Sequence, residues 1–597
     1  MNNNKRVYLI IGVITITMLV MGVTTAWFTW NSTTNTDVTF NVNGIDIINT
    51  NVDIIGKKLY PTMNKDNGIV EEFTVKQNSD ISTPVCSDFT LTLTTLPTEL
   101  QHKSFKYKLY NGTNLVGSGN FEGKTQGQVI TIATSQPITS EISTYKLYIW
   151  IDGNMDNPLS MGGKSFLFKL TIKANQQENA CTPSIITCDA DDVTPNTPVL
   201  AEGMIPIKWD GSKWVKASTD NWYNYSNKEW ANAVMVSSAT RSSYMSDVTK
   251  PVGSEVLEDD ILAYYVWIPR YKYQLFNVSS EVMDPIEICT QFEGKGTTKS
   301  TGSTDGAWLT HPAFTFGTEE LSGIWVGKFE TSVDDNDACY GSVSHANCNK
   351  ELNNPRIKPN KSSLLEQRVI NQFLTSKKFG TIDYLTSDGV SMVDAHMMKN
   401  TEWGAVAYLK QSKYGLGTTD IAINAYHRGV NSYVNFMTGC GPKSETDLTS
   451  KTTTCTSYTS SAGVMSSTTG NITGVYDMAG GASEYVMGVM KTEDGTSFVY
   501  SESGFTTSTL PLGSKYVDAY TYGTSDADYT RRILGDATGE TRGWYSDYAS
   551  FLNDSTFSFF SRGLLPYSGS LAGVFTFARS TGGISNVYSF RSTLATQ

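Results

Sequence analysis

The side chains that usually carry enzyme chemistry are few in this chain of 597 residues and lack the spacing of known active sites. The five histidines stand alone, at His102, His311, His345, His396 and His427. The chain has no H-E-x-x-H, no G-x-S-x-G, no Walker loop and no G-x-G-x-x-G after a strand. A metal site could still assemble in space, but a single histidine is by default a satisfied or exposed side chain. The pattern favours a binding or structural protein over an enzyme.

Two acidic clusters are the remaining candidates for metal chemistry. The run Asp334-Asp335-Asn336-Asp337 resembles the opening of a calcium loop, but it lacks the turn glycine and the closing glutamate. Asp189, Asp191 and Asp192 could attract a cation, although they lie among prolines and polar residues and an acidic, solvated linker explains them more simply.

The eight cysteines indicate an oxidising compartment. Three pairs lie close in sequence, without the C-x-x-C spacing of zinc sites: Cys181 with Cys188, Cys339 with Cys348, and Cys440 with Cys455. We expect them to form short-loop disulfides, each stabilising the fold by roughly 2 to 3 kcal/mol. Cys86 and Cys289 are left over as candidates for free thiols.

Residues 1–30 predict a signal or membrane anchor. Lys5 and Arg6 precede an uncharged run from Val7 to Ala26, just long enough to cross about 30 Å of hydrocarbon. Both charges lie on the short N-terminal side, so the body is expected outside the cytoplasm. A small-residue stretch at 24–26 also suits signal cleavage, and the sequence leaves anchor and cleaved signal open. Either way we expect a cell-surface protein, membrane-anchored or secreted.

The charge balance excludes nucleic acid as a partner. The formal net charge is -12, and the lysines and arginines are scattered over the chain, so no basic field is available to neutralise phosphates. The length exceeds what one hydrophobic core supports, which predicts two or three domains.

Residues 31–175 predict an all-β sandwich, because apolar and polar residues alternate there in short runs. Phe105, Tyr107 and Leu109 share a face and are followed by an Asn111-Gly112 hairpin turn. Prolines, acids and polar residues at 176–200 predict a linker.

Residues 201–597 predict an α+β domain with extensive loops. Aromatic-rich strands are expected at 205–214 and 261–276. One helix should begin at a capping box formed by Ser363 and Glu366, and a second should run from near Asn400 to Gly415. The expected fold class is therefore α+β and multidomain, with an N-terminal membrane helix, an all-β sandwich and this larger domain.

The start of the sandwich carries a first resemblance. The run AWFTWNS at 26–32 resembles the "AYFTD" juncture of the camelysin-like and biofilm-fibre β-sandwich proteins that Gram-positive bacteria secrete. Trp27 and Trp30 replace the usual Tyr and Asp. The resemblance supports the surface localisation.

The second domain resembles the formylglycine-generating-enzyme-like domain. The segments at 323–331 (GIWVGKFET), 400–407 (NTEWGAVA) and 474–486 (GVYDMAGGASEYV) resemble its "GKYEVT" strand, "EAEWEYAA" helix and "GLYDMxGNVWEWV" segment. Ser561-Arg562-Gly563 and Ser589-Phe590-Arg591 fit its "RGGSW" start and "GFR" end. Order and spacing agree over about residues 262–597. The resemblance implies a C-type-lectin-like fold.

The resemblance also bears on catalysis and metal binding. Oxidase members use a cysteine pair between the last two segments, and residues 563–589 contain no cysteine, so no thiolate is available to hold copper. We therefore expect no enzyme activity. The family's calcium site is carried over at Glu484, whereas Gly481 replaces an asparagine and Ser483 a tryptophan. This implies a structural calcium ion bound by Glu484 and the backbone at Gly481; a turn-capping role for Glu484 is the alternative.

Some members of this fold family are variable proteins of diversity-generating retroelements, in which the segment before the "FR" end is hypermutated. The segment 562–591 is similar in layout, and Ala572-Gly573-Val574-Phe575 resembles the fixed "AGVF" framework. We expect Val574 and Phe575 in the core and the flanking side chains on one solvent-facing, ligand-binding surface. These flanking residues are Leu564, Leu565, Pro566, Tyr567, Ser568, Ser570, Leu571, Ala578, Arg579, Ser580, Thr581, Ile584, Asn586 and Val587.

The sequence thus predicts a surface-displayed receptor or adhesion protein with an unknown extracellular ligand, either protein or glycan. Tyr567 and Arg579 are the expected anchors, because tyrosine and arginine combine apolar area with directed hydrogen bonds. The alternatives are a structural surface fibre or adhesin without a diversified site, and an oxidase of the formylglycine-generating type. A segment that merely completes the last strand and loop of the domain is also compatible with these residues.

Overall fold

The protein, seen in a computed structural model, forms two compact units, 1–189 and 190–597. The structure describes residues 28–31, 40–42, 45–49, 59–62, 65–77, 85–102, 104–112, 114–152, 161–176, 181, 193–283, 285–334, 348–386, 393–430, 433–510 and 513–596. The boundary between the units falls inside the stretch predicted as a linker. Strands account for 34% of the residues and helices for 14%, so the architecture is mostly β and is built from several sheets.

The predicted membrane segment at 7–26 lies outside the described residues. Within the described part of the chain, no helix combines the length and the apolar character needed to cross a bilayer.

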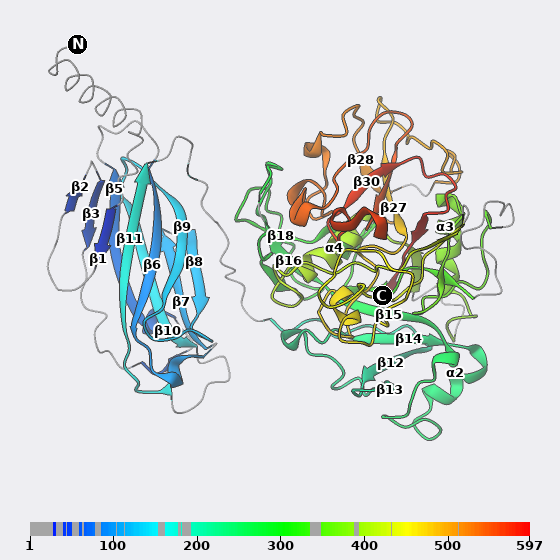
Figure 1. The fold of residues 1–597 in the computed structure, drawn as a ribbon, viewed down its shortest axis with the longest axis horizontal. Coiled ribbons are helices and arrows are strands. Elements are labelled where there is room, and N and C mark those ends of the chain that lie inside the picture. Colours follow the sequence, from blue (N-terminus) through cyan, green and yellow to red (C-terminus); the bar gives the residue numbers. More distant parts are fainter. Residues whose placement is uncertain are drawn as a thin grey trace, which may run out of the picture. The chain divides into compact units, whose positions relative to one another are not determined.

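The N-terminal unit consists of two antiparallel layers of strands (Figure 1). One sheet has the order β1-β11-β6-β9, with β1 (Phe28–Asn31), β6 (Val85–Thr95), β9 (Val129–Ile138) and β11 (Leu167–Gln176). The other has the order β2-β3-β5-β10-β7-β8, with a short parallel β4 on β10. Its strands are β2 (Phe40–Val42), β3 (Ile45–Asn49), β4 (Pro61–Thr62), β5 (Ile69–Gln77), β7 (Phe105–Asn111), β8 (Asn114–Asn120) and β10 (Ser143–Asp152).

The alternation read from the sequence places one face of each strand in a shared core. In β10, Tyr145, Leu147 and Ile149 are fully buried while the residues between them face outward. Rings from different sheets meet there, with Phe89 of β6 4.7 Å from Tyr145. The predicted hairpin joins β7 to β8, and Gly112 adopts the positive φ of 58° that such a turn requires. The sandwich prediction is confirmed.

The disulfide pattern differs from the expected one. Cys440–Cys455 forms as predicted, but Cys181 bonds to Cys86 instead of Cys188. The reason is strand pairing, since β11 lies antiparallel to β6 and ends beside Cys86, so the chain leaving β11 reaches that thiol directly. Cys289, expected to be free, is also disulfide-bonded, as is Cys348. No described cysteine is free, which places the body in an oxidising, extracytoplasmic compartment.

The C-terminal unit is organised by two sheets. The main sheet has the order β13-β12-β14-β15-β21-β32-β24. Its strands are β12 (Met204–Trp209), β13 (Trp214–Lys216), β14 (Asn232–Val236), β15 (Ile261–Pro269), β21 (Gly323–Gly327), β24 (Val393–Met397) and β32 (Ser592–Thr596). The second sheet has the order β28-β27-β29-β30, with β31 on β27. Its strands are β27 (Ser483–Met490), β28 (Asp518–Tyr520), β29 (Phe559–Arg562), β30 (Phe577–Ser580) and β31 (Tyr588–Phe590).

Smaller sheets complete this unit. Three strands form β17-β16-β18, and three two-stranded pairs lie elsewhere. Their bounds are β16 (Tyr271–Gln274), β17 (Thr290–Phe292), β18 (Trp308–Thr310), β19 (Thr315–Phe316), β20 (Glu319–Glu320), β22 (Ser332–Val333), β23 (Ser362–Ser363), β25 (Arg428–Val430) and β26 (Tyr433–Asn435). The last strand of the chain, β32, lies inside the main sheet between β21 and β24, so the C-terminal residues close its core.

Three described α-helices accompany these sheets: α2 (Ser238–Met245), α3 (Val369–Ser376) and α4 (Asn400–Lys410). Helix α4 starts as predicted, where the Glu402 carboxylate accepts from the backbone N of Lys399 at 2.8 Å, but it ends at Lys410 and not at Gly415. The capping box expected at Ser363 is wrong. Ser363 is in β23, where its hydroxyl donates to Glu330, and Glu366 has a positive φ of 63°, so α3 begins only at Val369.

We predict that Phe89→Ala destabilises the N-terminal unit alone. Phe89 is fully buried between Phe73 and Tyr145, so the cavity should cost about 3 to 5 kcal/mol. Calorimetry should show a lower melting temperature for the N-terminal unit and an unchanged melting temperature for the C-terminal unit. Val129→Ala, at a 59% exposed position of β9, is the control and should change neither. An equal shift of both transitions would show that the two units do not melt independently.

Candidate functional site

A buried ion pair lies at the centre of the C-terminal unit. Glu484 belongs to β27, whose eight residues are all buried, and the register places it opposite Arg562 of β29 and Ser589 of β31. Arg591 follows β31 directly. Its Nε and Nη2 donate to the two oxygens of Glu484 at 3.1 and 2.5 Å.

The Arg591 guanidinium also forms hydrogen bonds to two of the segments that carry the family resemblance. Arg591 Nη1 donates to the carbonyl of Gly327 at 2.7 Å, and Nη2 donates to the carbonyl of Tyr476 at 3.0 Å. Segments 323–331, 474–486 and 589–591 therefore converge on one side chain. Bidentate pairing with a carboxylate is the geometry that arginine satisfies best in a dry interior.

Two further carboxylates lie beside this pair. Asp477 accepts from the amide of Asn424 at 2.8 Å and from the backbone N of Gly439 at 3.0 Å. Glu330 accepts from the Ser363 hydroxyl at 2.7 Å, and its Oε2 is buried without a partner. We call Glu330, Asp477 and Glu484 the acid cluster. Sequence reasoning singled out only Glu484, although the other two stand in the same quoted motifs.

Burial sets the charge of the acid cluster. It raises the pKa of Glu484 to about 7 and that of Asp477 to about 6, with the positive charge of Arg591 opposing the rise in both cases. The pKa of Glu330 is raised well above its ordinary value, first by burial and then by the negative charges of Asp477 and Glu484. At moderately acidic pH the acid cluster therefore holds protons that exposed carboxyl groups would have lost.

The Glu484 carboxylate is paired with Arg591 in this structure, and the structural calcium ion that the resemblance implied stays a prediction. Both oxygens of Glu484 already accept from Arg591, so a cation bound there would lie against a guanidinium. Gly481 lies close to the Glu330 carboxylate: a Cβ added at position 481 would lie 3.0 Å from Glu330 Oε1, which is a tight contact.

The segment 562–591 rests on a rigid buried frame. Val574 and Phe575 are in the core, as expected. The carbonyl of Val574 accepts from Trp403 Nε1 of α4 at 2.8 Å, and the backbone N of Phe575 donates to the Asp547 carboxylate at 2.9 Å. A side chain at position 573 would place its Cβ 2.0 Å from that carboxylate, so the close approach requires Gly573.

The fourteen flanking residues differ in exposure. Tyr567, Ser570, Leu571 and Ile584 are exposed, and a second group is half-buried: Leu564, Ser568, Ala578, Arg579, Thr581, Asn586 and Val587. The expectation of a solvent-facing position is wrong for Leu565, Pro566 and Ser580, which are buried. Leu565 packs with Leu365, Phe436 and Ala482. This apolar side chain, although it lies in a glycine- and serine-rich loop, is therefore buried in a small hydrophobic cluster.

The two expected anchors have different neighbours. The Tyr567 ring is 52% exposed and meets the His427 ring edge-on at 5.4 Å. Arg579 instead forms an ion pair with Asp526 at 3.1 Å and donates to Ser550 Oγ at 3.2 Å. Its guanidinium is thus engaged within the protein, and Arg579 is a structural residue in this conformation.

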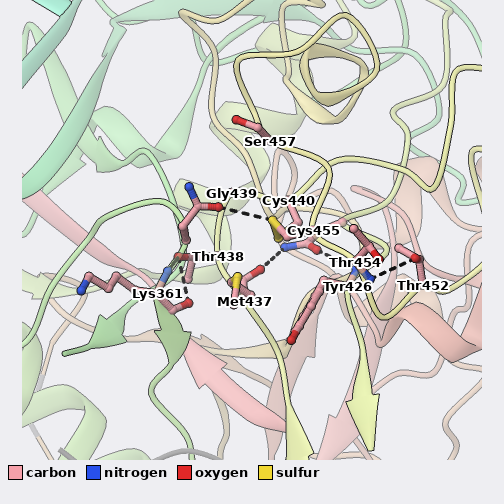
Figure 2. Close-up of a disulfide and its surroundings, with 12 residues drawn as sticks. Lys361, Tyr426, Met437, Thr438, Gly439, Cys440, Thr452, Thr454, Cys455 and Ser457 are labelled. Carbon is pink, nitrogen blue, oxygen red and sulfur yellow. Dashed lines mark hydrogen bonds between the residues drawn. A yellow bond between two sulfur atoms is a disulfide. The ribbon is translucent and has the colours of Figure 1, made fainter. Parts of the chain in front are cut away.

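A disulfide supports the Tyr567 side of the segment (Figure 2). Cys440–Cys455 links the turn after Met437 to the loop containing Thr452. The backbone N of His427 donates to the carbonyl of Thr452 at 2.8 Å. The backbone that carries the His427 ring is therefore attached to a loop that the disulfide closes. In the chain-entropy picture, closing a loop of this length stabilises the fold by about 3 kcal/mol.

The remaining chemical candidates are accounted for or lie outside the described residues. His396 Nε2 contacts Glu402 at 2.9 Å, and burial lowers the pKa of His311 to about 3. Asp334 forms ion pairs with Arg356 and Lys361. His345, the rest of the 334–337 run and the acids at 189–192 are not among the described residues.

No protein-family model matches the chain, and no curated protein matches it.

We predict that the acid cluster makes the C-terminal unit less stable as the pH rises from about 4.5 to 7. The folded state keeps protons that the unfolded carboxyls have lost in this window, so unfolding releases protons and stability falls with pH. Glu330→Gln keeps the hydrogen bond to Ser363 but removes one acid, and melting temperatures between pH 4.5 and 7.5 should then vary less than in the wild type.

The matched control is Glu319→Gln, at an exposed position in the same unit, which should reproduce the wild-type pH profile. If Glu330→Gln shows the wild-type slope, the acid cluster does not control the pH dependence.

Proposed function

We propose that this chain is a surface-displayed, extracytoplasmic protein that binds a ligand, protein or glycan, through the C-terminal segment 562–591. The single observation that carries the proposal is an exposed apolar patch on an otherwise buried frame. Tyr567 and Leu571, 52% and 45% exposed, lie in the stretch Pro566–Leu571, one on each side of a backbone kink at Gly569. Tyr548, 43% exposed, is joined to them because its backbone N donates to the carbonyl of Leu571 at 3.0 Å.

The Tyr567 patch, formed by Tyr548, Tyr567 and Leu571, has the composition of a contact surface. Tyrosines supply large, rigid area with a hydrogen-bonding group, and they are enriched where binding energy concentrates. Tyr548 and Tyr567 are the only exposed tyrosines among the C-terminal side chains whose exposure the structure describes. Contiguous exposed apolar groups mark interaction sites more often than isolated ones do.

A binding role is also supported by where the ionisable groups lie. Glu330, Asp477 and Glu484 are at most 1% exposed, so none of them is available to a substrate. The frame beneath the patch is fixed by Trp403, Asp547 and Phe575, which resembles the division between constant scaffold and variable surface in a C-type-lectin-like variable protein. We propose that division for this chain, with residues of the segment free to change while the frame stays.

The surface localisation is part of the proposal. The disulfides place the body in an oxidising compartment, and the apolar run at 7–26 after Lys5 and Arg6 would supply a membrane anchor or a secretion signal.

We predict that protease added to intact cells producing the full chain digests its body. The charges before the apolar run orient the body outward, so immunoblotting should show loss of the full-length band while a cytoplasmic marker survives. Protection of the full chain on intact cells, with digestion only after lysis, would place the body inside.

We predict that Tyr567→Ala combined with Leu571→Ala removes ligand binding without unfolding the protein. Full-length chain would be applied to printed arrays of glycans and of cell-surface proteins, and signals of the wild type and the double variant compared. Signals that depend on the patch should fall at least tenfold, about 1.4 kcal/mol or more. The melting temperature should change little, because both side chains are about half exposed.

Ile382→Ala is the control, since Ile382 is a 58% exposed apolar residue elsewhere in the unit and should leave the array signals unchanged. Arg579→Ala should instead lower the melting temperature, because it breaks the contacts to Asp526 and Ser550. Array signals that are equal for wild type and double variant, or a wild type that binds no probe, would contradict the proposal.

A further inference from the structure

A cavity in the C-terminal unit is lined by tryptophans. It has a volume of about 230 Å³ and lies over strands β12, β13 and β14 and the loop at 471–473. Its four tryptophans are Trp209, Trp214, Trp222 and Trp230. In Figure 1, β12 and β13 lie at the opposite edge of this unit from β30 of the segment 562–591. The cavity is therefore a feature separate from the Tyr567 patch.

The floor of this tryptophan cavity is already satisfied by the protein. Trp230 Nε1 donates to the carbonyl of Tyr414 at 2.8 Å, and Trp214 Nε1 donates to the Tyr458 hydroxyl at 3.1 Å. Asn232 donates to the carbonyl of Thr473 at 2.8 Å and accepts from Lys328 Nζ at 2.9 Å. These groups hold the walls in place and have no need of a ligand.

Polar groups at another side of the cavity have no such partners. Trp222 is 4% exposed, and its Nε1 is buried without a hydrogen-bond acceptor, which is costly for an indole N–H. Lys208, Asn227 and Glu229 line the same cavity, are exposed, and their side chains take part in no hydrogen bond or ion pair with another described residue. Donors and an acceptor thus remain available around aromatic walls.

We propose that this cavity binds a single neutral sugar ring. The edge-on pair Trp209 and Trp214, with ring centroids 5.5 Å apart and planes at 69°, offers an aromatic face to the C–H side of the ring. The exposed polar groups of Lys208, Asn227 and Glu229 can pair with the hydroxyls at its edge. The volume lies below the ~300 Å³ typical of drug-sized ligands, which suits one ring.

The charges at the cavity decide in favour of a neutral ligand. For a quaternary ammonium, the attraction of Glu229 is opposed by Lys208, and Lys328 Nζ already lies 5.2 Å from the Trp214 ring centroid. For an anion, the attraction of Lys208 is opposed by Glu229. With one lysine and one glutamate at the cavity, an uncharged ligand with several hydroxyls can pair with both.

The test uses the full-length chain and ligand-observed NMR titrations with the methyl glycosides of glucose, galactose, mannose and N-acetylglucosamine, and with choline as the cationic probe. At least one glycoside should bind saturably. Trp209→Ala should weaken it about tenfold through loss of the stacking face. Asn227→Ala and Glu229→Ala each remove an exposed polar group at the cavity, and each should weaken binding severalfold.

Two controls separate this site from the rest of the protein. Trp308→Ala removes a half-buried tryptophan outside the cavity and should leave the glycoside Kd unchanged. Tyr567→Ala should also leave it unchanged, whatever the array experiments show. The proposal is overturned if no glycoside saturates, if choline binds at this cavity in their place, if Tyr567→Ala weakens the glycoside, or if all three cavity variants bind it like the wild type.

Discussion

The pairing of Arg591 with Glu484 is the interaction on which the C-terminal unit depends. Placing two charges in a dry interior costs several kcal/mol per ion unless the geometry and the remaining hydrogen bonds are satisfied. Here the guanidinium also donates to the carbonyls of Gly327 and Tyr476, so the main sheet and the second sheet are joined at one point. Because Arg591 directly precedes the last strand, β32, the two sheets can close only when the C-terminus is in place.

The acid cluster follows from that pairing. A lone carboxylate would stay protonated at such depth, and Arg591 offsets the burial of Glu484 and Asp477 only in part. Glu330, farther from this compensation, has an unpartnered oxygen. The unit therefore tolerates unsatisfied polar character in its centre, and the many hydrogen bonds to Ser363, Asn424 and Gly439 are what keep it ordered.

The segment 562–591 combines a rigid, buried backbone with exposed side chains that the packing does not constrain. Trp403, Asp547 and Gly573 fix the backbone under the segment 562–591 so closely that no Cβ fits at Gly573. Side chains that point away from this frame, such as Tyr567 and Leu571, are not needed for packing. The tryptophan cavity follows the same logic, since Trp214 and Trp230 are held by the protein while Trp222 and the exposed polar groups are not.

Local physics was sufficient for part of this structure. The alternation around Tyr145, the Asn111-Gly112 turn, the start of α4 beside Glu402 and the Cys440–Cys455 bond all depend on residues near one another in sequence, and all were predictable from it. The burial of Val574 and Phe575 was also predicted, but from the resemblance of the segment and not from a local pattern.

The contrary cases depend on partners distant in the chain. Cys181 bonds to Cys86 because β11 pairs with β6. Ser363 donates to Glu330 and therefore does not cap a helix. Leu565 is buried against Leu365 and Phe436. The position of Glu330 and Asp477 beside the Glu484–Arg591 pair, and the position of four tryptophans around one cavity, have the same origin. Sequence determines which side chains seek a partner, whereas only the tertiary structure decides which partner each one reaches, because burial and strand register act across hundreds of residues.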